Sequence, residues 1–332
     1  MQDIYRRIQR EYEESRSKAL AEVDARKKEL YEREPELAKI DEEIQKQGLE
    51  ITKSVIFVDD DSKREEIIRE LNSVMDRLKQ KKAEIFAKMG IPEDYLKPSF
   101  SCSLCEDTGI VGSITGAKPC NCFRQKVINY TYNQAQIFNL ERENFLTFDE
   151  SVFSEEKKPA YNSDKSPREN IRMIREIAEK FVERFGEKET KSLMFTGGTG
   201  LGKTFLSNCV AKAVMDAGYT VLYQTAGLLM DLIMDYRKGD SERFDASQYE
   251  ELFEVDLLII DDLGTENVTE ARRSELFNIL NTRILKGKKI LISTNRDLKE
   301  LVNFYDQRIV SRILGNFQIC RFFGSDLRLA SK

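Results

Sequence analysis

The spacing of apolar residues divides the chain into a helical first third and a mixed remainder. Residues 1–98 are rich in Glu, Lys, Arg, Leu and Ile and poor in Gly and Pro, which is typical of exposed helices. Pro35 marks a break or a helix start. Further along, apolar residues recur at heptad-like spacing and predict an antiparallel helical hairpin with one apolar seam. The alternative is that this seam, or the opposite face, docks a partner protein. The seam residues are Ile67, Leu71, Val74, Leu78 and Ile85.

The second half of the chain alternates short apolar runs with helical stretches of ten to twenty residues. Such alternation is typical of a parallel sheet that is covered by helices on both faces. We therefore predict an α/β fold for this part. The expected strands are 193–195, 220–223, 255–260 and 289–293, and the expected helices are 169–185, 204–215 and 226–238.

A glycine-rich loop follows the first of these strands. Residues 197–204 read GGTGLGKT, which fits the phosphate-binding pattern G-x-x-x-x-G-K-T between a strand and a helix. Glycines let the backbone amides wrap around phosphate, and the helix N-terminus adds positive potential. Lys203 is expected to reach the β- and γ-phosphates of ATP, and Thr204 to bind Mg²⁺; the alternative is a glycine turn without a ligand. The predicted nucleotide-binding residues are Gly197, Gly198, Thr199, Gly200, Leu201, Gly202, Lys203, Thr204 and Phe205.

Two carboxylates and an amide follow the next strands. Asp261 and Asp262 end a buried apolar run, and we expect Asp261 to hold Mg²⁺ and Asp262 to deprotonate the attacking water. The chain has 0 histidines, so a carboxylate is the available base. Asn295 ends the following strand, where an amide can reach the γ-phosphate or the water. The alternatives are solvated acids at a strand end and an Asn that caps the turn before Leu298.

Four closely spaced cysteines predict a structural zinc site. They form C-x-x-C, a gap of 14 residues and then C-x-C, which fits tetrahedral coordination without histidine. Unligated thiols are the alternative. The expected ligands are Cys102, Cys105, Cys120 and Cys122, whereas Cys209 and Cys320 are expected in the core.

Composition narrows the class of protein. The net charge is −5, which does not indicate a dedicated duplex-DNA binder. No apolar stretch is long enough to span a membrane, and the N-terminus lacks the apolar segment of a signal peptide. We therefore expect a cytoplasmic protein with reduced cysteines.

The order of phosphate loop, acidic strand and Ser-Thr-Asn strand resembles the AAA+ (ASCE) ATPase core. More narrowly, the DDLG run at 261–264, the RIVSRI run at 308–313 and the FGSDLR run at 323–328 resemble helicase loaders of the DnaC/DnaI type and the related transposition helper ATPases. The resemblance covers about residues 140–332. The paired cysteines also resemble the DnaI-type loaders and are unusual in the transposition helpers.

This resemblance implies roles for three further side chains. Asn295 is similar to the sensor 1 residue, Arg312 to an arginine finger that enters a neighbouring subunit's ATP site, and Arg328 to the sensor 2 arginine. Arg308 is the competing finger, and a surface salt bridge is the alternative for each arginine. Asp262 departs from the family, which usually has Glu there, and the shorter side chain predicts slow ATP hydrolysis.

In the DnaA and DnaC group, the helix at 226–238 faces a central channel that contacts single-stranded DNA. Candidate DNA contacts are therefore Tyr223, Tyr236, Arg237 and Lys238. The alternative is an ordinary core helix with a polar end.

The resemblance implies an ATP-dependent loader of a replicative helicase, hexameric and DnaB-type, onto single-stranded DNA. Self-association through the AAA+ domain would accompany it. The predicted parts are a helical partner-binding region (1–98), a zinc module (99–135) and an AAA+ ATPase domain (140–332). The alternatives are an ATP-binding helper for DNA transposition and a nucleotide-gated scaffold with little hydrolysis.

Overall fold

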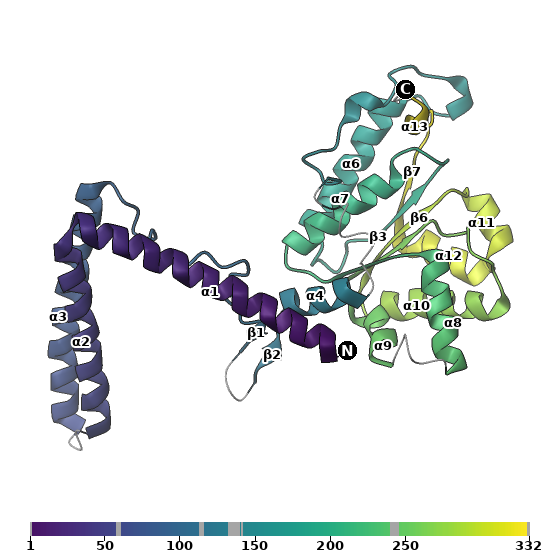
Figure 1. Ribbon diagram of the computed structural model, residues 1–332. Coiled ribbons are helices and arrows are strands. Elements are labelled where there is room, and N and C mark those ends of the chain that lie inside the picture. The colour runs from purple at the N-terminus through teal and green to yellow at the C-terminus, as the bar shows by residue number, and fades with distance from the viewer. Residues whose placement is uncertain are drawn as a thin grey trace. The chain divides into compact units, whose positions relative to one another are not determined.

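The protein is described from a computed structural model, which describes residues 2–57, 61–112, 116–131, 140, 142–239 and 246–330. Contacts divide the chain into two compact units, and Figure 1 shows their elements. One unit is Gln9–Ala117, and the other is Met1–Ile8 together with Lys118–Lys332. The division falls inside the segment 99–135 that was expected to form one module, so the three-part domain organisation stays a prediction.

The first unit is built from long helices. They are α1 (Gln2–Arg33), α2 (Pro35–Phe57) and α3 (Asp61–Met89), and the short strand β1 (Ile110–Val111) follows. The expected break is present, because α2 begins at Pro35, where the missing N–H leaves no bond unmade. α2 and α3 pack as the expected hairpin, and each seam residue of α3 is half-buried (Figure 1). No helix among the described residues is both long and apolar enough to cross a bilayer.

A polar cluster joins the three helices where they meet. Asp41 of α2 accepts a hydrogen bond of 2.6 Å from the Tyr31 hydroxyl of α1 and pairs with the Lys82 ammonium of α3 at 2.5 Å. The apolar core beside it contains Leu30, Leu37 and Phe86. A partly buried ion pair of this kind fixes which helix faces meet.

The second unit contains the parallel sheet and its covering helices. Its elements are β2 (Lys118–Pro119), α4 (Asn121–Thr131), η1 (Glu150–Val152), η2 (Pro159–Tyr161), α6 (Pro167–Glu183), β3 (Ser192–Thr196), α7 (Lys203–Asp216), β4 (Val221–Thr225), α8 (Ala226–Lys238), α9 (Ala246–Glu254), β5 (Leu257–Asp261), α10 (Glu270–Leu285), β6 (Lys289–Thr294), α11 (Leu298–Phe304), α12 (Gln307–Asn316), β7 (Phe317–Arg321) and α13 (Leu327–Ala330).

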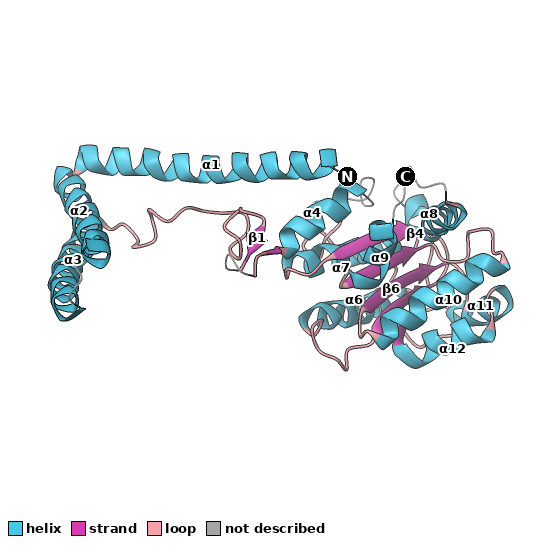
Figure 2. Cartoon of the chain, turned by 90° about the horizontal axis from the view of Figure 1, so that it is seen from below, coloured by secondary structure: helices cyan, strands magenta, loops and turns pink. Residues whose placement is uncertain are grey.

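The five strands of this sheet run in the order β4-β5-β6-β3-β7, and every pair is parallel. One apolar cluster packs α6 and α7 on one face, and a second packs α8, α10 and α12 on the other, so helices lie on both sides of the strands (Figure 2). The four predicted strands and the α/β class are confirmed. β6 lies between the phosphate-loop strand β3 and the acidic strand β5, which is the strand order of the AAA+ (ASCE) core.

The edge strand β4 is completed by a side chain. Gln125 of α4 is buried; its Nε2 donates to the Val221 carbonyl at 2.9 Å, and its Oε1 accepts from the Val221 amide at 2.6 Å. One amide thereby imitates one residue of a neighbouring strand. Because unpaired strand edges promote aggregation, α4 protects the edge that it covers.

Arg283 of α10 is the largest fully buried side chain. Its guanidinium donates to the carbonyls of Leu252 at 2.7 Å, Val255 at 2.9 Å and Lys289 at 2.7 Å, and burial lowers its pKa to about 9. Leu252 lies in α9, Val255 in the loop that enters β5, and Lys289 is the first residue of β6. Arg283 therefore ties the amino ends of two central strands to one helix.

Replacing Arg283 by Met should lower the free energy of unfolding by about 3 kcal/mol, because three buried carbonyls lose their donors. Urea denaturation followed by circular dichroism measures this change. Arg272→Met, on the same helix, removes a more exposed ion pair with Asp231 and should change stability by about 0.5 kcal/mol. Equal losses in the two variants would contradict the account.

Candidate functional site

The phosphate loop joins β3 to α7 at the carboxyl edge of the sheet. Gly197, Gly200 and Gly202 have φ of 145°, 74° and 85°, which favour glycine. A side chain at Gly197 would collide with the Phe322 carbonyl, and one at Gly200 with the Asp326 carboxylate. The Leu327 amide also donates to the Gly200 carbonyl at 3.0 Å. The segment after β7 therefore packs directly against the loop, and two of the glycines are needed for that contact.

The Lys203 ammonium is buried and donates three hydrogen bonds. Its Nζ donates to the carbonyls of Gly197 and Gly198 and to Asn295 Oδ1, each at 2.7 Å. The side chain is 5% exposed, and burial lowers its pKa; the carboxylates of Asp262 and Asp261 oppose this shift. A bound phosphate would have to replace some of these acceptors.

Asp261, at the end of β5, accepts hydrogen bonds from three hydroxyl groups. Its Oδ2 accepts from Thr204 Oγ1 at 3.1 Å and from the Tyr223 hydroxyl at 2.9 Å, and its Oδ1 accepts from Ser293 Oγ. Thr204 and Asp261 thus face each other across the mouth of the loop. A hydroxyl and a carboxylate in this position are oxygen donors that suit Mg²⁺, so these residues fit the ion.

Asp262 turns its carboxylate into the same space. It has φ of 55°, the left-handed conformation that Asp adopts more easily than most residues, and its amide donates to Ser293 Oγ at 3.0 Å. Burial and the neighbouring Asp261 raise its pKa. Asn295 Nδ2 donates to Asp262 Oδ1 at 3.3 Å. Asn295 therefore bridges the loop lysine and the second carboxylate.

A cavity of about 400 Å³ lies over these groups. Its lining gathers most of the predicted nucleotide-site residues, among them the exposed Arg328, together with two residues that were not predicted, Glu143 and Leu327. Gly197 and Gly198 instead line a second cavity of about 590 Å³ beside it. The predicted lining residues are Thr199, Gly200, Leu201, Gly202, Lys203, Thr204, Phe205, Asp262 and Asn295.

Arg328 and Glu143 differ in whether the sequence indicated them. Arg328 was expected from the FGSDLR run, and its guanidinium interacts electrostatically with Lys203 and Asp262. Glu143 was missed, because a lone Glu in an irregular segment matches no motif. The support that Tyr223 gives to Asp261 was missed for the same reason.

The two candidate finger arginines lie on α12 and differ in their engagement. Arg308 pairs with Asp306 at 2.8 Å and lies over the Phe277 ring at 5.0 Å. Arg312 is exposed, and its side chain makes no hydrogen bond or ion pair with the described residues. Neither arginine lines the cavity of its own chain.

The four candidate DNA contacts do not form one exposed surface. Tyr223 is 3% exposed and bonded to Asp261, so its expected stacking on a base is wrong. Tyr236 stacks on Tyr249 with ring centroids 4.9 Å apart. Arg237 pairs with Glu275 at 2.7 Å, and Lys238 approaches Asp235 at 4.0 Å. Arg237 and Lys238 remain exposed candidates.

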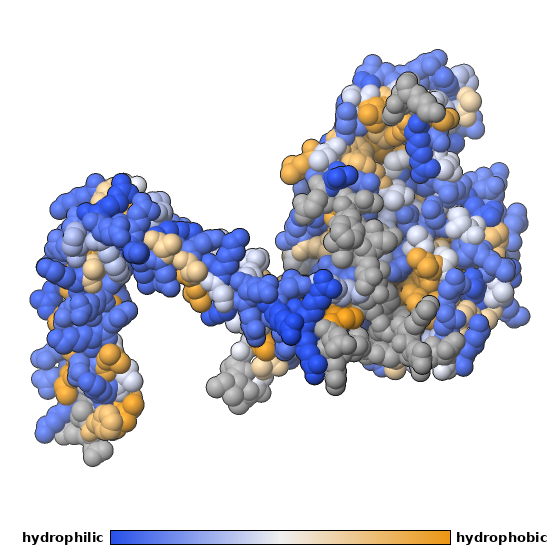
Figure 3. All heavy atoms as spheres, viewed as in Figure 1, coloured by the Kyte–Doolittle hydropathy of each residue, from blue (hydrophilic) through white to orange (hydrophobic). Residues whose placement is uncertain are grey.

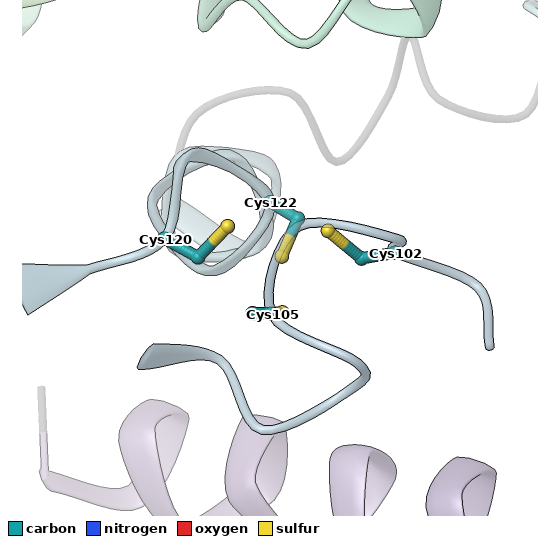
Figure 4. Close-up of side chains that lie close together, drawn as sticks. All are labelled: Cys102, Cys105, Cys120 and Cys122. Atoms are coloured by element: carbon teal, nitrogen blue, oxygen red, sulfur yellow. The ribbon is translucent and has the colours of Figure 1, made fainter. Parts of the chain in front are cut away.

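The four paired cysteines come together. Their sulfur atoms all lie within 4.8 Å of one another, and Figure 4 shows the side chains facing a common space. Tetrahedral zinc with bonds of about 2.3 Å would place the sulfurs about 3.8 Å apart, so the set fits the ion. Asp107, 2% exposed, accepts from the amides of Ser101 and Cys102 at 2.9 and 2.8 Å and fixes the first pair. Cys209 and Cys320 are buried elsewhere, as predicted.

Comparison with known proteins identifies the region around the loop. Residues 161–319 match the family model described as IstB-like ATP binding protein. This region is therefore similar to IstB-like ATP-binding proteins. Together with the strand order, this match confirms the predicted AAA+ class for the domain.

Curated relatives match part of this chain over part of their own length. The chromosomal replication initiator protein DnaA of Acinetobacter baylyi (strain ATCC 33305 / BD413 / ADP1) is 32% identical over 143 residues, which is 42% of this chain and 30% of that protein. The DnaA of Chlorobaculum tepidum is 31% identical over 130 residues, 38% of this chain and 25% of the relative. The chain thus matches less than a third of the length of these relatives.

Solved structures overlap with the chain more loosely. A crystal structure of DnaI has a TM-score of 0.44 at 22% identity and covers 58% of this chain and 95% of its own. The DnaC helicase loader has a TM-score of 0.43 at 22% identity, covering 56% and 99%. The fold assignment rests on the strand order of the sheet.

Asn295→Ala should separate nucleotide binding from hydrolysis. Without the Asn295 acceptor the empty state of Lys203 is less stable, so ADP should bind about threefold to tenfold more tightly. ATP turnover should fall at least tenfold, because Asp262 loses its donor. Titration with a fluorescent ADP and a phosphate-release assay measure the two effects. Lys203→Ala, the control, should bind neither nucleotide; weaker ADP binding by Asn295→Ala would refute the lysine–asparagine contact as a competitor.

Freshly purified, reduced protein should contain about one zinc per chain by elemental analysis. Cys105→Ser should lose most of the metal, because a three-thiolate set binds zinc less tightly. Cys320→Ala is the matched control, since this thiol is remote from the cluster, and should keep the metal. Zinc-free wild-type protein would remove the site.

Proposed function

We propose that this chain is an ATP-hydrolysing loader that delivers a hexameric, DnaB-type replicative helicase to single-stranded DNA. The observation that carries the proposal is the combination of an IstB-like ATP site with a separate helical unit and a cysteine cluster before it. A nucleotide switch on one unit and a partner-binding surface on another is what a loader requires.

The ATP site supplies its own hydrolytic groups. Asp262 would accept a proton from the attacking water, Asn295 would orient that water and Lys203 would contact the transferred phosphate. Magnesium bound by Thr204 and Asp261 would neutralise charge on the β- and γ-phosphates. Asp is shorter than Glu, so hydrolysis is expected to be slow, which suits a switch.

The exposed Arg312 supports assembly between subunits. Its guanidinium is unpaired within the described part of the chain. Such a group on the surface can enter the ATP site of a neighbouring copy and fork across its phosphate oxygens. Arg308 is already paired with Asp306 and is the weaker candidate.

The helical unit offers apolar side chains for a partner. Val55, Ile56 and Phe57, in the last turn of α2, are 53%, 64% and 77% exposed. Hydrophobic atoms gather at this end of the hairpin in Figure 3. Contiguous exposed apolar residues are typical of protein-interaction surfaces.

The loader proposal is tested by binding of the full-length chain to a purified replicative helicase from the same cell. The expected result is a stable complex that Phe57→Glu weakens and that Leu20→Glu, at another exposed apolar position, leaves intact. Loading of the helicase onto circular single-stranded DNA should require ATP and fail with Lys203→Ala. No complex and no loading would exclude the proposal.

An ATP-binding helper for DNA transposition is the second candidate, because the DDLG, RIVSRI and FGSDLR runs resemble that group as well as the loaders. It would bind duplex DNA in the presence of ATP and show no preference for a helicase. A nucleotide-gated scaffold would bind ATP and hydrolyse almost none, with or without DNA. Filter-binding and turnover assays therefore separate the three functions.

Arg312→Ala should leave ATP binding intact but lower both turnover and ATP-dependent self-association at least tenfold, because an arginine finger acts on the neighbour's site. Sedimentation velocity with an ATP analogue and a phosphate-release assay measure the effects. Arg308→Ala is the matched control on the same helix and should have a small effect. If Arg308→Ala instead lowers turnover and self-association and Arg312→Ala has a small effect, Arg308 is the finger.

A further inference from the structure

Glu143 brings a third carboxylate to the ATP cavity from outside every motif. It lines the cavity with Thr204 and Asp262. The segment that carries Glu143 contacts both α7 and α6. Glu143 accepts a hydrogen bond from Asn208 Nδ2 of α7, and the Phe145 carbonyl accepts one from Arg175 of α6 at 3.4 Å. The carboxylate is therefore positioned by the fold.

Asn208 defines the side of the cavity on which Glu143 lies. It is 1% exposed and sits one helical turn after Thr204, on the same face of α7. Thr204 in turn faces Asp261 at 3.1 Å. The Asn208 contact and the shared cavity lining therefore place Glu143 on the Thr204 side, where the residues fit Mg²⁺.

Magnesium in nucleotide sites keeps several of its waters, and those waters are strong hydrogen-bond donors. Asp261 is engaged by Thr204, Tyr223 and Ser293. Glu143, which lines the same cavity as Thr204, supplies a further carboxylate acceptor. We propose that Glu143 accepts hydrogen bonds from the waters of the nucleotide-bound magnesium and that Asn208 is its positioning residue. The inference rests on the ATP-binding part of the proposed function and is independent of the partner.

The proposed contact predicts a dependence of ATP affinity on Mg²⁺ that other contacts would not produce. A carboxylate beside a triphosphate repels it unless a cation lies between them. Removing the charge of Glu143 should therefore weaken binding of Mg-ATP and leave binding of metal-free ATP unchanged or stronger. A contact to the ribose or the base would instead lose affinity equally with and without the metal.

The test is titration of the full-length protein with a fluorescent, slowly hydrolysed ATP analogue in Mg²⁺ and in EDTA. Glu143→Gln should bind about tenfold more weakly in Mg²⁺, the size of a charge-assisted hydrogen bond, and no more weakly in EDTA. Asn208→Ala should shift binding in the same direction by a smaller factor. Glu156→Gln, an exposed carboxylate after η1, is the matched control and should match wild type in both buffers.

Thermal melting without nucleotide checks that each variant folds, and Glu143→Asp keeps the charge and should fall between wild type and Glu143→Gln. An equal loss for Glu143→Gln in both buffers would overturn the proposal, and so would no loss in either. Wild-type protein that binds no nucleotide would instead refute the ATP site itself.

Discussion

The buried ammonium of Lys203 is the constraint on which the site depends. A charge with 5% exposure must be satisfied, and in this structure two loop carbonyls and Asn295 satisfy it. These bonds shape the glycine loop before any nucleotide arrives. They also connect the loop strand β3 with the neighbouring strand β6, because Asn295 follows the last residue of β6. We therefore propose that nucleotide binding is an exchange of acceptors in which Lys203 releases Asn295.

The rest of the ATP-binding unit holds the three strand ends in place for that exchange. Parallel pairing aligns Thr196 of β3 with Thr294 of β6, and β6 lies between β3 and the acidic strand β5. Arg283 fixes the opposite ends of β5 and β6 to α10. The segment after β7 packs against the phosphate loop, where the Leu327 amide donates a hydrogen bond to the Gly200 carbonyl.

Motifs with a strict backbone geometry could be predicted from the sequence. The loop at 197–204 and the acidic strand before Asp261 are local patterns, and the parallel sheet follows from apolar runs that alternate with helices. The heptad spacing of α3 likewise predicted its seam. Tyr223 shows where this reasoning ends: the resemblance to the DnaA and DnaC group suggested that its ring stacks on DNA, whereas its hydroxyl is buried against Asp261. Glu143 reaches the cavity only through the path of an irregular segment, which no periodicity describes.

The central claim is that Lys203 exchanges Asn295 for a phosphate when ATP binds. A crystal structure with Mg²⁺ and a non-hydrolysable ATP analogue tests it most directly. The account predicts the β- and γ-phosphates within hydrogen-bond reach of Lys203 Nζ, and Asn295 Oδ1 no longer bonded to it. A nucleotide bound elsewhere, or a Lys203–Asn295 contact that persists beside bound phosphates, would contradict the account.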